Sequence, residues 1–189
     1  RQYGLHTANP DNFTIAVNWM LFGELVSFWR GAPKFWRLGT SENGKSVWPE
    51  MRDNQIASIG WNDVGNLDQA GLTKVVIQST LVSKGYNDPK NVLSRKAGEI
   101  FDFVDADPQD IIVAADGQRI KGIGRISGHY NYDPDMPTFF HTRPVEWLIT
   151  DVDLPVLEEG LRTSFVELKQ PFTRDLIRSI LENKPMATQ

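Results

Sequence analysis

Trp61 closes an apolar run, residues 56–61, and is followed directly by Asn62 and Asp63. An aromatic ring can stack on a planar base, while amide and carboxyl groups beside it can read the edge of that base by hydrogen bonding. The sequence therefore predicts a base pocket at Trp61, Asn62 and Asp63. Trp48 flanks the polar loop that precedes this run, and we expect it to be a second pocket aromatic.

The polar loop itself, residues 39–46, matches the phosphate-binding pattern G-x-x-x-x-G-K-[ST]. A working P-loop needs a long helix that starts at the loop, because the helix N-terminus holds the phosphates. Pro49 falls inside the place of that helix, at a cost of about 3 kcal/mol, and a new strand is under way by Ile56. We expect Lys45 to be a loop cation that contacts a phosphate, with a P-loop nucleotide-binding protein as the alternative.

Signals for catalysis and for metal binding are weak. The chain has no cysteine, and neither a G-x-S-x-G nor an H-E-x-x-H pattern occurs. Ser127, His129 and Asp133 fall along one predicted strand and its exit, and the spacing of His129 and His141 is not that of a metal site. The sequence predicts a binding domain and not an enzyme, with no metal and no cofactor.

The charges are segregated although the chain carries a net charge of −4. An acidic total argues against a generic nucleic-acid binder, and residues 97–118 hold six acids and no base. Ordinary solvated charge is one interpretation; a basic face on an acidic domain is the other. For the second, the residues expected to contact phosphates are Lys34, Arg37, Lys45, Arg52, Arg119, Lys121 and Arg125.

Strands and helices alternate along the 189 residues, which are enough for one globular domain with a small appendage. A two-residue turn signal at Asp116-Gly117 predicts a hairpin, so part of the sheet is antiparallel and the fold class is α+β. The periodicities predict strands over 35–38, 56–61, 111–115, 118–132 and 139–150, and helices over 13–29, 72–82 and 89–104, with a last helix capped by Thr173.

Glycines interrupt the apolar face predicted for residues 118–132. If this strand is unbulged, its even positions share one face, which includes Gly122 and Gly124. Glycines on such a face mark the close approach of another group, and we favour a packed side chain over a ligand ring. Trp36 and Trp147 are expected to fill the core, since aromatic side chains dominate small cores.

Six segments carry a resemblance to a known family. FWRLG at 35–39, VWPEM at 47–51 and IASIGWNDVGNL at 56–67 resemble the EVE-like domain of McrB-family modification-dependent restriction proteins. DPQDIIVA at 107–114, IKGIGRISGHYNY at 120–132 and RPVEW at 143–147 follow the same pattern. The similarity covers residues 34–150.

The resemblance implies a PUA-like, YTH-related β-barrel with flanking helices that flips a modified base into an aromatic pocket. Carried over by position, Trp61 matches a pocket aromatic with Asn62 and Asp63 beside it. Ser41 and the 39–46 loop match the lip of the pocket, and Tyr130 or Tyr132 the opposite wall.

The resemblance also sets the expected organisation and partners. We expect an N-terminal helical extension over 1–33, the base-binding domain over 34–155, and a C-terminal helical segment over 156–189 that leads to a further domain. The expected partners are double-stranded DNA with a modified, methylated base, a downstream AAA+ GTPase domain and a nuclease subunit. We expect a cytoplasmic protein with no membrane partner; a modified-RNA reader and a protein-interaction module are the alternatives.

Overall fold

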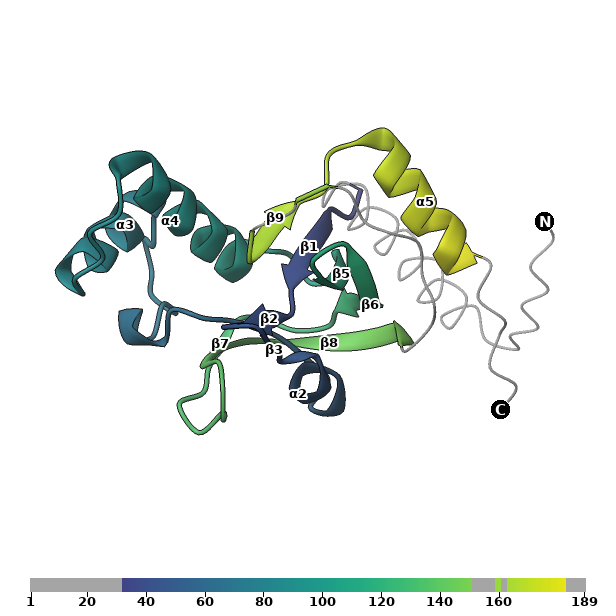
Figure 1. The fold of residues 1–189 in the computed structure, drawn as a ribbon, viewed down its shortest axis with the longest axis horizontal. Helices are drawn as coiled ribbons and strands as arrows, with labels where there is room; N and C mark the ends of the chain where they lie inside the picture. The colour runs from purple at the N-terminus through teal and green to yellow at the C-terminus, as the bar shows by residue number, and fades with distance from the viewer. Residues whose placement is uncertain (1–31, 151–158, 161–162, 183–189) are drawn as a thin grey trace, which may run out of the picture. The chain divides into compact units, whose positions relative to one another are not determined.

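The computed structural model describes residues 32–150, 159–160 and 163–182 (Figure 1). The chain divides into two compact units, Arg1–Pro33 and Lys34–Gln189, and the second unit is described here. The helix predicted over 13–29 lies outside the described residues. In chain order the elements are β1 (Phe35–Gly39), β2 (Ser41–Glu42), β3 (Lys45–Ser46), α2 (Trp48–Asp53), β4 (Ile56–Ile59), the 3-10 helix η1 (Asn62–Val64), α3 (Lys74–Ser83), α4 (Lys90–Asp105), β5 (Ile111–Asp116), β6 (Arg119–Ile126), β7 (Asn131–Tyr132), β8 (His141–Thr150), β9 (Phe165–Glu167) and α5 (Pro171–Glu182).

The main sheet is mixed and curled, with the strand order β4-β8-β6-β5-β1-β9 and with β7 paired to β8 (Figure 1). β1 and β5 run parallel, and the other neighbours in this sheet run antiparallel. The predicted hairpin is present, and its two turn residues are Gly117 and Gln118, because Asp116 pairs with Arg119. The predicted α+β class, a curled sheet with flanking helices, is confirmed.

Both faces of the central strands are buried. Along β5, Ile112 and Ala114 belong to a first apolar cluster, and Ile111, Val113 and Ala115 to a second. This explains why β5 is a continuous apolar run. The first cluster is completed by α2, α3 and α4, which contribute among others Met51, Ile77, Leu81, Ile100 and Phe103, and the second by the segment of β9 and α5, through Leu168 and Ile177.

The alternation predicted for residues 118–132 is wrong because the strand is bulged. Ala114 pairs with Gly122 and Ala115 with Ile120, so Lys121 is an extra residue in β6. The bulge turns Ile120 toward the second cluster. Beyond residue 126 the chain leaves this strand, and β7 pairs with β8 instead.

Gly122 lies against a tryptophan ring. A Cβ atom placed on Gly122 would lie 2.4 Å from Cη2 of Trp48. The expectation of packing at this glycine is therefore confirmed. Trp36 is also a core residue, as predicted, with 4% of its surface exposed and its ring stacked on Phe165 at 4.8 Å.

The C-terminal residues belong to the same unit as the sheet. β9 pairs with β1, with Leu38 opposite Phe165, and Ile177 of α5 is fully buried. The division expected at 155/156 therefore does not separate residues 163–182 from the unit that contains the sheet. Thr173 is not the cap of the last helix: α5 begins at Pro171, and Thr173 is buried in its first turn.

Candidate functional site

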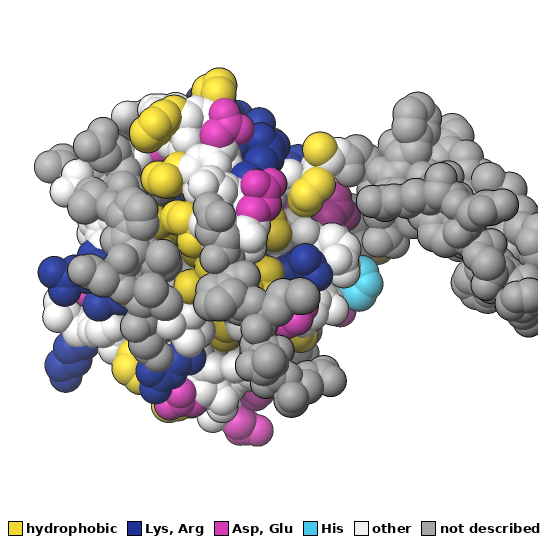
Figure 2. Space-filling model, turned by 90° about the vertical axis from the view of Figure 1, so that its right-hand side faces the viewer, with side chains coloured by type: hydrophobic (Ala, Val, Ile, Leu, Met, Phe, Trp, Pro, Cys, Tyr) yellow, Lys and Arg dark blue, Asp and Glu magenta, His cyan; other side chains and the backbone are white. Residues whose placement is uncertain are grey.

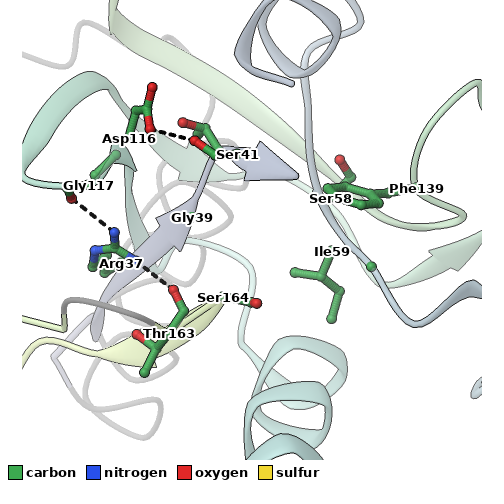
Figure 3. Close-up of a pocket in the computed structure, with 13 residues that line it drawn as sticks. Arg37, Gly39, Ser41, Ser58, Ile59, Asp116, Gly117, Phe139, Thr163 and Ser164 are labelled. Atoms are coloured by element: carbon green, nitrogen blue, oxygen red, sulfur yellow. Dashed lines mark hydrogen bonds between the residues drawn. The ribbon is translucent and has the colours of Figure 1, made fainter. Parts of the chain in front are cut away.

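A cavity of about 410 Å³ opens where β1, β4 and β5 end (Figure 3). Arg37 lies on one side of it, and Ser58 and Phe139 lie on the other. The segment that precedes β9 closes a further side through Thr163 and Ser164. The remaining lining residues are Gly39, Thr40, Ser41, Ile59, Gly60, Ala115, Asp116 and Gly117.

Buried hydroxyl groups line this cavity. Thr40 is fully buried, and its backbone is held by a hydrogen bond from its N–H to Ala115 O (3.1 Å) and one from Val47 N–H to its carbonyl (2.8 Å). Its hydroxyl oxygen has no partner among the described residues. Ser58 is 1% exposed. A buried hydroxyl without a partner costs stability, and Thr40 is a lining residue of the cavity with such a hydroxyl.

Arg37 is held inside the molecule and does not lie on its surface. Its guanidinium donates to Thr163 O (2.6 Å) and to Gly117 O (3.0 Å), and its Nε has no partner among the described residues. Burial lowers the pKa of Arg37, against the opposing effect of Glu99 and Asp116. With 3% of its surface exposed, Arg37 cannot contact the backbone of a duplex as predicted.

Glu99 stands behind the wall of the cavity. Its carboxylate accepts from Ser164 N–H at 2.9 Å and lies 3.5 Å from Arg95. Burial raises the pKa of Glu99, and the hydrogen bond from Ser164 and the charges of Arg95 and Arg37 oppose that rise. Arg37 therefore faces the lining acid Asp116, while Glu99 behind the wall is paired with Arg95. This balance disfavours an anionic ligand in the cavity.

The rim and the apolar wall complete the site. Ser41 is exposed and donates to Asp116 Oδ1 at 2.5 Å (Figure 3), so it lies at the mouth, where the pocket lip was expected. The wall is formed by Ile59 and by Phe139, whose ring packs against Gly60. An aromatic ring, buried hydroxyls and a carboxylate therefore converge on one cavity.

Trp61, Asn62 and Asp63 lie beside the cavity and do not line it. The Trp61 ring is partly buried against the first apolar cluster. Asn62 donates to Thr138 O (2.9 Å) and accepts from Phe140 N–H (3.0 Å), so its amide is occupied by the protein. Asp63 is exposed and accepts from the Tyr86 hydroxyl at 2.9 Å.

The remaining aromatic candidates are also outside the lining. Trp48 is 5% exposed and makes an edge contact with Trp147 at 4.8 Å, so it is a core residue and its predicted place in the pocket is wrong. The Tyr130 hydroxyl lies 2.8 Å from His141 Nδ1, and the Tyr132 hydroxyl 3.4 Å from Asn62 O. The Tyr132 hydroxyl therefore contacts the loop around Trp61 directly, and the Tyr130 hydroxyl contacts His141.

The loop that matches the P-loop pattern is a β-hairpin. Ser41 pairs with Ser46 across β2 and β3, and the turn is formed by Asn43 and Gly44, with φ of 49° and 79°. Positive φ at both central residues is typical of a two-residue hairpin turn. The helix that follows, α2, has six residues with Pro49 in its first turn. The alternative of a P-loop nucleotide site is therefore wrong.

The basic residues are divided between two ends of the sheet. Lys45 and Arg119 are exposed near the mouth of the cavity, on the β2–β3 hairpin and opposite Asp116 respectively. Lys34 and Arg125 lie at the other end, beside Ile111. On the face drawn in Figure 2, Lys and Arg side chains are scattered among Asp and Glu. Arg125 forms an ion pair with Glu146 (3.8 Å), and Arg52 forms one with Asp53 (2.8 Å). Lys121 is half-buried and occupies the bulge near the mouth of the cavity.

Within the described part of the chain, no group of three His, Asp or Glu side chains could hold a metal ion. In the same residues no helix is both long and apolar enough to cross a membrane.

Comparison with known proteins gives the family. The profile of a domain of unknown function, DUF8426, matches residues 36–167, more than half of the chain. The chain belongs to the DUF8426 family. The match runs from β1 to β9 and includes every residue that lines the cavity. No curated protein matches the chain.

One solved structure similar to this DUF8426 domain is the YTH domain of the Zygosaccharomyces rouxii MRB1 protein, in complex with N6-methyladenosine RNA. The two share 12% sequence identity with a TM-score of 0.43, over 84% of this chain and 93% of that one.

Sequence reasoning missed most of the lining of the DUF8426 cavity. Thr40 and Ser58 are small polar residues within or beside apolar strands, and no spacing rule marks them. Phe139 resembled the start of a strand, and residues 163–164 were assigned to a separate segment. The one available signal in the residues was the end of an apolar strand followed by polar side chains, which singled out Trp61, beside the cavity. Ser41, which lines it, was named only through the family resemblance.

Proposed function

We propose that this chain is a non-enzymatic specificity domain that binds a modified, methylated base flipped out of double-stranded DNA. The observation that supports this is the cavity of about 410 Å³, one of whose lining residues, Thr40, has a buried hydroxyl without a partner among the described residues. Its volume lies in the range of small-ligand sites, roughly 300–1,000 Å³. The resemblance to the EVE-like domain suggests the wider context, a cytoplasmic modification-dependent restriction system with an AAA+ GTPase domain and a nuclease subunit as partners.

The wall and floor of the cavity suit a neutral heterocycle. Phe139 supplies an aromatic surface, and Thr40 and Ser58 supply hydroxyls that can donate or accept. Stacking on an aromatic ring contributes about 1–3 kcal/mol per base, which offsets a flipping cost of a few kcal/mol. The charge of Arg37 is balanced by Asp116 and that of Glu99 by Arg95, which favours a neutral base over a phosphate.

Phosphates would lie outside the cavity. Lys45, Arg119 and Lys121 stand near its mouth, and no ion pair is found for them among the residues that the structure describes. Cations placed this way hold the backbone of a duplex while the cavity holds the base, a division between positioning and specificity contacts.

The decisive substitution is Thr40→Val, which replaces the unpartnered hydroxyl by a methyl group of the same shape. The variant is expected to be at least as stable as wild type, since no protein hydrogen bond is lost, but to bind the modified base about tenfold less well. The measurement is a titration of duplexes that carry N6-methyladenine, 5-methylcytosine or 4-methylcytosine in one sequence, against the unmodified duplex.

Thr142→Val is the matched control. Thr142 is also buried, but its hydroxyl donates to Asn131 O at 3.2 Å, away from the cavity. This variant should lose stability and keep its discrimination. A single strand of RNA with N6-methyladenosine forms a further arm: binding there and not to modified DNA would replace DNA by RNA as the ligand, and binding to no modified strand would refute the proposal.

A further inference from the structure

The backbone is strained at the edge of the cavity. Trp61 follows Gly60, a lining residue, and has φ of +67° and ψ of +36°, in the left-handed region. For a bulky side chain this conformation is rare and persists only where the surroundings hold it. The contacts of the Trp61 carbonyl and of the loop that follows it show what holds it here.

A directed chain of hydrogen bonds closes this loop. His141 is fully buried, and its Nε2 lies 3.0 Å from Trp61 O, which can only accept, so Nε2 carries the proton. The other ring nitrogen, Nδ1, then accepts from the Tyr130 hydroxyl at 2.8 Å. The Tyr130 oxygen accepts in turn from Leu67 N–H at 3.3 Å. The chain thus ties Trp61 to Leu67, and it requires a neutral His141.

The same loop positions the aromatic wall of the cavity. Asn62 donates to Thr138 O and accepts from Phe140 N–H, so it holds the residues on both sides of Phe139. The Phe139 ring is 6% exposed and packs against Gly60. A displacement of the loop would therefore move Phe139.

We propose that His141 and Tyr130 are positioning residues for base binding, which hold Trp61 and, through Asn62, Phe139 in the binding arrangement only while His141 is neutral. This role rests on the proposed function. The ionisable groups that face His141 are Tyr130 and Tyr132 from β7 and its approach, and Asp63 from η1.

Protonation of His141 would disrupt this series of hydrogen bonds. With both ring nitrogens as donors, Nδ1–H would point at the Tyr130 oxygen, which already accepts from Leu67, and the Tyr130 hydroxyl would lose its acceptor. Burial lowers the pKa of His141 below 6.5, against the hydrogen bond to Trp61 and the charge of Asp63. Binding should be constant above pH 6.5 and weaken only when the pH falls through the lowered value.

The test uses the full chain and the methylated duplex that wild type binds best, titrated between pH 5 and pH 8. Tyr130→Phe should lower affinity about tenfold at pH 7 and move the acid decline to higher pH, because the hydroxyl that favours neutral His141 is gone. Tyr86→Phe is the matched control: it removes a tyrosine hydroxyl from the outer side of the same loop, where Asp63 accepts it, and should leave the profile unchanged.

A second variant separates positioning from folding. In His141→Gln the amide can still donate to Trp61 O but does not titrate, so affinity at pH 7 should be retained in part and the acid decline should vanish. Two results would overturn the positioning role alone, provided that the wild type binds the methylated duplex. One is an affinity of Tyr130→Phe equal to that of the wild type, and the other is an unchanged loss of affinity at acid pH in His141→Gln. A wild-type protein that binds no modified strand would instead overturn the proposed function, and this role with it.

Discussion

The packing around Gly122 requires a residue without a Cβ atom. The ring of Trp48 occupies the space in which a Cβ would stand, and the carbonyl of Ile149 lies 3.0 Å from the same point. Neither neighbour can retreat, because Trp48 is wedged against Trp147 and the carbonyl belongs to the β6–β8 pair. Packing at this position is therefore intolerant of any larger residue.

Gly122→Ala is expected to lower the free energy of unfolding by about 1–3 kcal/mol, the usual cost of overpacking a core. Gly98→Ala is its control. A Cβ on Gly98, inside α4, would meet only Lys74 Nζ at 4.0 Å, so this variant should gain about 1 kcal/mol from helix propensity. Chemical denaturation of both measures the difference, and equal stabilities would contradict the packing argument.

Residue types alone predicted little of the site. Ser41 was expected at the lip of the pocket from the family resemblance, and it lines the mouth of the candidate cavity. Trp48 was misplaced because an aromatic residue beside such a loop can turn either way, and the direction depends on a glycine in a strand 74 positions later in the chain. Thr40 was missed because its distinguishing feature is a buried hydroxyl without a hydrogen-bond partner among the described residues, which the sequence does not reveal.

At the scale of elements, local signals gave reliable predictions and long-range pairing did not. α4 and the β5–β6 hairpin follow from apolar periodicity and turn residues that lie close together in the chain. The bulge at Lys121 cannot be deduced that way, because a bulge is defined by the register of a partner strand. The pairing of β9 with β1 was also missed for this reason.

The β2–β3 hairpin makes a testable contribution to binding through Lys45. We expect Lys45→Ala to weaken binding to modified and unmodified duplexes alike, and to lower the slope of log K against log salt concentration by about 1. Lys34→Ala is the matched control, since Lys34 stands at the other end of β1, where its Nζ lies over the Trp36 ring and its backbone N–H donates to Asp110. Titrations at several salt concentrations measure the slope, and a change in base preference for Lys45→Ala would count against a phosphate contact.

For the molecule as a whole, the second apolar cluster shows that the folded unit extends beyond residue 155. Leu168 and Ile177 are fully buried against strands of the sheet, and both lie beyond the boundary at residue 155 that the sequence suggested. Composition could not indicate this, because a helix that covers a sheet and a helix that leads to another domain have the same amphipathic pattern.

A fragment of residues 34–155 is therefore expected to lack a cooperative thermal transition, whereas a fragment of residues 32–182 should melt cooperatively. The reason is that the shorter fragment loses β9 and α5 and exposes the cluster around Phe35 and Ile123. Circular dichroism during heating makes the comparison. Similar transitions in both fragments would show that the sheet is stable without its C-terminal cover.

The bonds of Arg37 also bear on the order of events during synthesis. Its contact with Thr163 spans 126 positions, and the one with Gly117 spans 80. Contacts between such distant residues form late, because a long loop must first be closed. A nascent chain can thus assemble the α3–α4 pair and the β5–β6 hairpin early, whereas the cavity is complete only after Thr163 and Ser164 have been synthesised and have joined β1.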